Sequence, residues 1–192
     1  MDIRNFFFKY RSFTPVPIAL LIIYFAHTPN PLIIYGIVIL ALGEGIRLWA
    51  VAFAGGKTRT REVGAPSLCT SGPYAQIRNP LYTGNMLMYA GIVLIAGAPN
   101  IWWMLAVTMI FFLIQYSLII SLEEETLKNL FGQEYETYQE NVPSILPRLR
   151  PWKNKDQREP MSLLKTLKTE KRTLQNVVFV LLLISIRIQY FS

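Results

Sequence analysis

The sequence lacks the residues from which disulfide frameworks and most transition-metal sites are built. Its 192 residues include one cysteine, Cys69, and one histidine, His27. A single cysteine excludes an intramolecular disulfide framework. Because cysteine and histidine form no cluster, we expect neither zinc nor iron–sulfur chemistry, and no metal site is predicted.

Charged residues are also scarce. They make up 16% of the chain, whereas hydrophobic residues make up 52%. A soluble domain carries about 25% charged residues, and a disordered chain is much less hydrophobic than this one. The apolar residues lie in long blocks, which predicts one all-α domain over residues 1–192 in a polytopic integral membrane protein.

Five apolar segments predict four to five transmembrane helices. A crossing needs about 20 mostly apolar residues, and the candidates are 15–26, 32–54, 80–97, 101–121 and 174–186. No small-residue cleavage site follows the first segment, which predicts a retained span rather than a signal peptide.

The C-terminal part is predicted to contain a basic connector at 149–173 and a hydrophobic helix at 174–192. The apolar stretch of this helix is short and is followed by Arg187. The pattern leaves open whether the helix crosses the membrane or lies tilted at its surface.

The lysines and arginines predict the orientation. In a membrane protein, a net charge of +7 indicates cytoplasmic loops and contacts with anionic lipid headgroups rather than with nucleic acid. The N-terminal arm and the segments 55–79 and 123–173 carry basic residues, whereas the loops 27–31 and 98–100 carry none. The positive-inside rule therefore places the N-terminus and both long polar segments on the cytoplasmic side, where they can meet.

The second candidate span contains two ionisable residues, Glu44 and Arg47. Charged groups at that depth usually face the interior of a helix bundle. Three residues apart on a helix, the two can pair with each other, so both a packing pair and a functional site stay open. The adjacent Gly43 and Gly45 are typical of helix packing.

The dipeptide Asn79-Pro80 predicts the start of the third span. Asparagine is a favoured N-cap and proline a favoured first helical residue, which already explains the pair. The same geometry has a functional interpretation. A helix start at the membrane rim presents free N–H groups, and Arg78 beside it would complete an anion site.

Three glutamates, Glu123-Glu124-Glu125, follow the fourth span. Apolar residues continue at helical spacing to Phe131, and Gly132 can end the helix. One helix over 101–131 would be about 46 Å long, longer than the hydrocarbon core of roughly 30 Å. Most glutamate runs are solvated surface, but carboxylates at a membrane exit also suit a cationic ligand or a proton acceptor. Beyond Gly132, a short amphipathic helix lying against the membrane is predicted from Tyr135, Tyr138, Val142, Ile145 and Leu146.

An anion-binding helix start and paired carboxylates at one rim would suit an amino-acid zwitterion with an attached cation. The ordered motifs resemble those of a known superfamily, the integral-membrane methyltransferases, which include isoprenylcysteine carboxyl methyltransferases and phospholipid N-methyltransferases. The motifs are Arg47-Leu48-Trp49-Ala50, Gly72-Pro73-Tyr74, Arg78-Asn79-Pro80-Leu81-Tyr82-Thr83-Gly84, Glu123-Glu124 and Phe131-Gly132-Gln133-Glu134-Tyr135-Glu136-Thr137-Tyr138. The resemblance covers the core region 40–148.

The resemblance implies a methyltransferase that uses S-adenosylmethionine at the cytoplasmic rim and takes a lipid or lipid-modified acceptor from the membrane. The cofactor-binding residues that it implies are Arg78, Asn79, Pro80, Tyr82, Glu123 and Glu124. The carboxylates would meet the amino group or the ribose of the cofactor. Because an amine must lose its proton before it attacks, Glu124 or Glu123 is also the predicted catalytic base.

Two departures from the family pattern bear on the acceptor. The isoprenylcysteine branch usually has histidine at the position of Asn79. It also tends to carry an arginine one turn before the glutamate pair, where this chain has Ile119 and Ile120. An apolar turn cannot supply the cation that a carboxylate acceptor needs. Such an acceptor would need Arg59, Arg61 or Arg78 in place of the missing arginine. A phospholipid amine is therefore favoured over an isoprenylcysteine carboxylate.

Two other classes of function stay open. Some sterol reductases resemble this superfamily, so an NADPH-dependent membrane reductase is one alternative, although no glycine-rich dinucleotide fingerprint follows a strand. A non-enzymatic membrane scaffold is the other. Binding of S-adenosylmethionine, NADPH or neither would separate the three. The sequence carries no signature of oligomeric state.

Overall fold

The computed structural model describes residues 2–28, 30–55 and 63–191. All regular elements in these ranges are helical, which confirms the predicted all-α membrane fold. The elements are α1 (Ile3–Tyr10), α2 (Val16–Tyr24), α3 (Ile33–Ala54), the 3₁₀ turn η1 (Gly72–Ala75), α4 (Pro80–Ala96), α5 (Ile101–Phe131), α6 (Gln133–Asn141) and α7 (Leu163–Phe191).

Three described helices, α3, α5 and α7, are long and apolar enough to cross a membrane. The helix α4 is apolar but shorter, with 17 residues. The first predicted span is the nine-residue α2, about half of the roughly 20 residues that a crossing needs. Its start at Val16 follows from Pro15 and Pro17, because proline suits the first turn of a helix but lacks the N–H group that would continue a helix from α1.

The helix α5 has the predicted bounds and ends where Gly132 takes a positive φ of 51°. The prediction for the C-terminal part was wrong in one respect, because α7 begins at Leu163, inside the predicted connector. Its first turns carry Thr166 and Glu170, which are 2% and 0% exposed. These buried polar side chains pack the first turns of α7 against the bundle. Because they are polar, the hydrophobicity pattern does not predict that the helix begins there.

Glycines bring the backbones of α3 and α4 together. A Cβ atom on Gly91 would lie 2.6 Å from the Leu40 nitrogen, and one on Gly43 would lie 2.7 Å from the Gly84 oxygen. Close approach through small residues is the usual way in which membrane helices pack. The packing role predicted for Gly43 is confirmed, whereas that for Gly45 is wrong, because a Cβ there would meet no atom within 4 Å.

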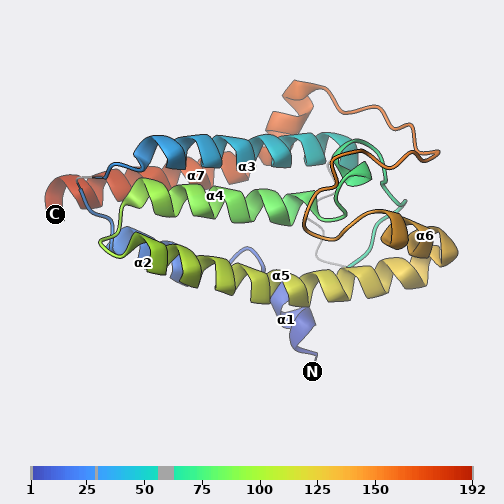
Figure 1. Ribbon diagram of the computed structural model, residues 1–192, viewed down its shortest axis with the longest axis horizontal. Helices are drawn as coiled ribbons and strands as arrows, with labels where there is room; N and C mark the ends of the chain where they lie inside the picture. Colours follow the sequence, from blue (N-terminus) through green and yellow to red (C-terminus); the bar gives the residue numbers. More distant parts are fainter. Residues whose placement is uncertain (1, 29, 56–62, 192) are drawn as a thin grey trace.

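The bundle has two ends, one near the C-terminus and one where α5 meets α6 (Figure 1), and their side chains make the first apolar and the second polar. At the apolar end, near the C-terminus, buried residues of α2, α4, α5 and α7 form a hydrophobic cluster around Ile22, Val93, Met104 and Ile184. At the polar end, η1, α6 and the segment between α6 and α7 gather where α5 ends.

The predicted short helix after Gly132 is α6, but it ends at Asn141, before Ile145 and Leu146, and it packs against protein. Its residues Tyr135 and Tyr138 are each 2% exposed and belong to a cluster with Leu68, Leu127 and Trp152. The tyrosines therefore hold the polar end together instead of facing a membrane.

Candidate active site

The start of α4 forms one side of the site. As predicted, Asn79 is the N-cap residue and Pro80 the first residue of the helix. The Asn79 side chain does not cap the helix. Its amide nitrogen donates instead to Ser144, at 3.2 Å to the carbonyl oxygen and 3.0 Å to Oγ. Asn79 thus ties the start of α4 to the segment that follows α6.

That segment runs alongside the start of α4 and is held by backbone groups. The Arg78 N–H donates to the Pro143 oxygen at 2.9 Å, and the Arg148 N–H donates to the Gln76 oxygen at 3.0 Å. The Thr83 hydroxyl donates to the backbone oxygen of Ile145 at 3.1 Å. No sequence motif marks this segment as part of the site. Its prolines signal only a loop.

Arg78 forms an ion pair with Glu124. Its Nε and Nη2 atoms lie 3.0 and 2.8 Å from Glu124 Oε1, and the two side chains are 9% and 17% exposed. The remaining nitrogen, Nη1, donates to the backbone oxygens of Gln139, at 3.0 Å, and Val142. The charge that was assigned to an anion site is therefore engaged with Glu124 and with the end of α6.

The three consecutive glutamates have three different environments. Glu124 also accepts from Gln139 Nε2 at 3.2 Å and from the Ser144 hydroxyl at 3.4 Å. Glu125 pairs with Arg4 of α1 at 2.7 Å. Glu123 accepts from the Tyr82 hydroxyl at 2.9 Å. Gln139 and Ser144, which carry no recognisable motif, were missed by sequence reasoning.

Aromatic residues surround the Tyr82–Glu123 contact. The centroids of the Tyr82 and Tyr116 rings lie 4.6 Å apart. Tyr116 belongs to a buried cluster that includes Phe8 of α1 and Ile119 of α5, and Tyr82 packs against this cluster. Together with the Arg4–Glu125 pair, Phe8 fixes α1 on α5 beside the glutamates. The carboxylate of Glu123 therefore lies beside this apolar cluster, to which Tyr82 connects it.

Tyr74, of the Gly72-Pro73-Tyr74 motif, lies within the fold of the polar end. Its backbone oxygen accepts from the Tyr138 hydroxyl at 2.8 Å. Burial raises the pKa of both tyrosines well above the usual range, so both hydroxyls stay neutral. Burial also raises the pKa of the Cys69 thiol, whose Sγ lies 3.6 Å from the Phe53 oxygen, which keeps the thiol in its unreactive form.

The predicted Glu44–Arg47 pair is replaced by a contact between distant helices. Arg47 of α3 pairs with Glu170 of α7, with Nη2 and Oε2 2.5 Å apart. Arg59 and Arg61, the other cations considered for the acceptor, lie outside the described residues.

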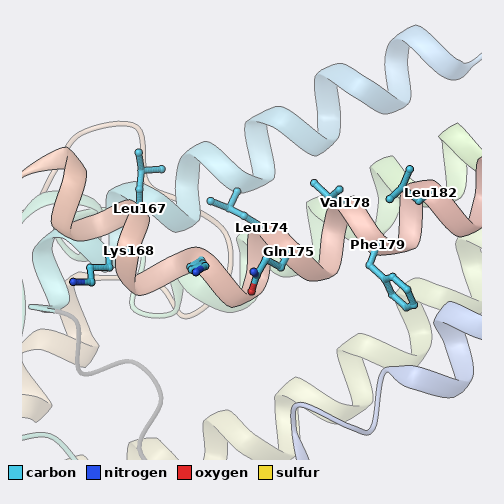
Figure 2. Close-up of a pocket in the computed structure, with 8 residues that line it drawn as sticks. Leu167, Lys168, Leu174, Gln175, Val178, Phe179 and Leu182 are labelled. Carbon is cyan, nitrogen blue, oxygen red and sulfur yellow. The ribbon is translucent and has the colours of Figure 1, made fainter.

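A shallow, open groove of about 600 Å³ follows one face of α7, and all eight residues that line it belong to that helix (Figure 2). Its walls are mainly apolar, from Leu174, Val178 and Leu182, and Lys168 and Lys171 line it near the start of the helix. The predicted site residues do not line it. The groove therefore lies apart from the glutamates. Its apolar side chains beside two positive charges suit an elongated apolar molecule that carries a negative group.

A family model and several known proteins match parts of this chain. The family model described as phospholipid methyltransferase matches residues 32–134. Protein-S-isoprenylcysteine O-methyltransferase B of Arabidopsis thaliana is 30% identical over 117 residues, which are 59% of this chain and 58% of that protein.

Two bacterial relatives have names that refer to metal resistance. The nickel-cobalt-cadmium resistance protein NccN of Alcaligenes xylosoxydans xylosoxydans is 30% identical over 103 residues, 54% of this chain and 44% of that protein. The cobalt-zinc-cadmium resistance protein CzcN of Cupriavidus metallidurans is 31% identical over 103 residues, 54% of this chain and 43% of that protein. The chain thus spans less than half the length of these two relatives. Because the family model covers more than half of the chain, including Arg78, Tyr82 and both Glu123 and Glu124, this integral membrane protein belongs to the phospholipid methyltransferase family.

Proposed function

We propose that this protein is a methyltransferase that uses S-adenosylmethionine and acts on a lipid or lipid-modified acceptor, with a phospholipid amine as the favoured acceptor. The observation that carries the proposal is the pair of adjacent carboxylates with different partners, Glu123 and Glu124, at the end of an apolar helix in a chain of this family. The site would face the cytoplasm, as the distribution of lysine and arginine favours.

The chemistry of the donor set fits the amino-acid part of the cofactor. A carboxylate can accept about four hydrogen bonds. In the part of the chain that the structure describes, Glu123 accepts one, from Tyr82. It therefore has capacity left for an ammonium group, while Asn79, Pro80 and Tyr82 would form the adjoining wall. When bound, S-adenosylmethionine supplies an electrophilic methyl group.

Glu123 is the better candidate for the catalytic base. Glu124 accepts hydrogen bonds from Arg78, Gln139 and Ser144, so its oxygens are already committed. An acceptor amine must lose a proton before its nitrogen lone pair can attack, and a Glu123 oxygen can take that proton. The Tyr82 hydroxyl fixes the direction of this carboxylate.

Glu124 and Arg78 have a positioning role in this proposal. Their ion pair fixes the end of α5 against the start of α4. The segment after α6 runs alongside that start and is bonded to it. Holding reactants in the correct orientation away from water supplies roughly 7–11 kcal/mol of a reaction barrier. The ion pair therefore contributes through the geometry that it enforces.

The interior of α5 favours an amine over a carboxylate acceptor. Ile119 and Ile120, one turn before the glutamates, are 0% and 6% exposed and pack in an apolar cluster. Arg78 is engaged with Glu124. A carboxylate acceptor needs a cation that pairs with it, whereas an amine acceptor needs the base that Glu123 offers.

Anionic lipids are the proposed partners of the groove on α7. Lys168 and Lys171 line it near the start of α7. Apolar side chains follow along the helix, among them Leu174, Val178 and Leu182 (Figure 2). This order matches an anionic headgroup followed by acyl chains.

The proposal is tested by calorimetric titration of the detergent-solubilised protein with S-adenosylhomocysteine. We expect saturable binding that Glu123→Gln weakens at least about tenfold, because an ammonium group loses its anionic partner. Glu125→Gln is the matched control and should bind like the unchanged protein. No binding by a folded sample would overturn the proposal, and NADPH would then be titrated.

Transfer of labelled methyl groups to phosphatidylethanolamine vesicles tests the acceptor and the base. Glu123→Gln should lose turnover even at saturating cofactor. Unchanged turnover in that variant would remove the base role, and transfer only to an isoprenylcysteine peptide would overturn the amine preference.

A further inference from the structure

A buried polar cluster joins α3, α4 and α7 between the apolar surfaces of the helices. Arg47 and Glu170, which form its ion pair, are 8% and 0% exposed. The Thr173 hydroxyl donates to the same Glu170 oxygen at 2.8 Å and accepts from Arg47 at 3.3 Å. Charged groups at such positions are costly in a membrane protein and usually serve its function.

Arg47 reaches the cluster by crossing over a glycine of α4. A Cβ atom on Gly84 would lie 2.6 Å from Arg47 Cγ. Past this point, Arg47 Nη1 donates to Asn85 Oδ1 at 2.6 Å. Gly84, in the motif that starts α4, thus leaves room for the Arg47 side chain.

Contacts lead from Asn85 to the candidate base. Asn85 lies three residues after Tyr82 on α4, so the two side chains lie on the same face of that helix. The Tyr82 ring lies 4.6 Å from the Tyr116 ring of α5, centroid to centroid. The Tyr82 hydroxyl donates to Glu123. Arg47 and the face of α4 that carries Asn85 and Tyr82 therefore link the C-terminal helix with the carboxylate at the end of α5.

We propose that Arg47 and Glu170 are positioning residues of the active site, which hold Asn85 and its face of α4 so that Tyr82, packed against Tyr116, is directed at Glu123. This inference rests on the proposed function for the role of Glu123. It gives α7, which lies outside the residues 32–134 that match the family model, a part in the site. If the cluster served only to attach α7, its loss would not reach Tyr82.

The first test follows the tyrosines directly and does not depend on activity. The full chain is labelled with 3-fluorotyrosine in detergent micelles, and the ¹⁹F resonances of Tyr82 and Tyr116 are assigned with Tyr→Phe variants. Glu170→Gln should move both resonances. Two nearly isosteric variants complete the set. Thr173→Val removes a hydroxyl of the cluster, whereas Thr169→Val removes one whose only partner among the described residues is the Lys165 oxygen of its own helix.

We expect Thr173→Val to move the resonances less than Glu170→Gln does and in the same direction, and Thr169→Val to leave them in place. Unmoved Tyr82 resonances in a folded Glu170→Gln or Thr173→Val protein would overturn the inference. Thr173→Val keeps the test decisive where Glu170→Gln does not fold, since it removes no charge.

The second test is a double-mutant cycle on S-adenosylhomocysteine affinity. Glu170→Gln should weaken binding about tenfold, because a small misplacement of a site residue has an effect of this size or larger. Adding Tyr82→Phe to that variant should cause little further loss, since both changes act through Glu123. Independent, additive losses would overturn the inference. If the unchanged protein does not bind the compound, the proposed function fails, and the ¹⁹F shifts alone decide whether the cluster positions Tyr82.

Discussion

The two ends of the helical bundle are stabilised in different ways. At the apolar end, Ile22, Val93 and Ile184 are almost fully buried in a cluster of hydrophobic side chains. At the polar end, side chains such as Arg78 and Asn79 bind the backbone of segments far away in the chain. Apolar packing depends on volume and shape, whereas each polar contact requires one particular partner. The candidate site therefore lies where single substitutions have specific effects.

The close approach of α3 and α4 should be the feature most sensitive to a change in volume. Gly91→Leu would place a side chain where a Cβ already lies 2.6 Å from the Leu40 nitrogen and 2.7 Å from the Gly36 oxygen. Neither backbone atom can move without parting the helices. We expect a loss of about 3 kcal/mol in the free energy of unfolding, measured by titration with SDS in mixed micelles.

Gly45→Ala is the control for this variant, because its Cβ would meet no atom within 4 Å. Alanine in a helix should stabilise the protein by about 0.5–1 kcal/mol relative to glycine. Equal stability of the Gly91→Leu and Gly45→Ala proteins would show that α3 and α4 do not approach as closely as the glycines indicate.

The corresponding test at the polar end is Arg78→Met. Methionine leaves the Glu124 carboxylate without its cation and the Gln139 oxygen without a donor. Removing one partner of a fully buried pair costs about 3–5 kcal/mol, and the partial exposure of this pair reduces the expected loss to about 2 kcal/mol. The measurement is the same SDS titration.

Arg148→Met provides the comparison within the same end. Arg148 donates to the backbone oxygen of Asn141 from an exposed position, so its loss should change the free energy of unfolding by less than about 1 kcal/mol. An effect as large as that of Arg78→Met would mean that the end of α6, rather than the ion pair, determines stability there.

Local patterns predicted the parts of the molecule that depend on neighbouring residues. The bounds of α5 follow from apolar spacing and from Gly132, and the start of α4 follows from Asn79-Pro80. The family resemblance identified site residues that the structure brings to one end of the bundle. What they bind stays a prediction.

Contacts between distant residues could not be predicted in the same way. Rules for helices relate residues three or four positions apart, so Glu44 was the expected partner of Arg47. The partner found in the structure is Glu170, 123 positions away. For the same reason, nothing indicated that Ser144 would bind Asn79 and Glu124, or that α7 would begin at a buried polar stripe.

A smaller effect is expected from Tyr138→Phe. The change removes the hydrogen bond from the Tyr138 hydroxyl to the Tyr74 oxygen, which is 2.8 Å long, but keeps the ring in its cluster. Loss of one such bond costs about 1 kcal/mol, measured as a shift of the unfolding midpoint. Tyr190→Phe, at an exposed position of α7, is the control and should leave the midpoint unchanged.

The packing of the segment before η1 is tested by the reactivity of Cys69. Burial raises the pKa of this thiol, and only the thiolate reacts. A free cysteine has a pKa of about 8.5, so between pH 7 and 8.5 the folded protein should be alkylated by iodoacetamide more slowly than the SDS-unfolded chain. Above that range, the rate in the unfolded chain levels off while the rate in the folded protein continues to rise, which narrows the difference. Equal rates at pH 8 would mean that the Cys69–Phe53 contact opens readily. The polar end would then owe its order to the Arg78–Glu124 pair and the segment after α6, and not to the chain before η1.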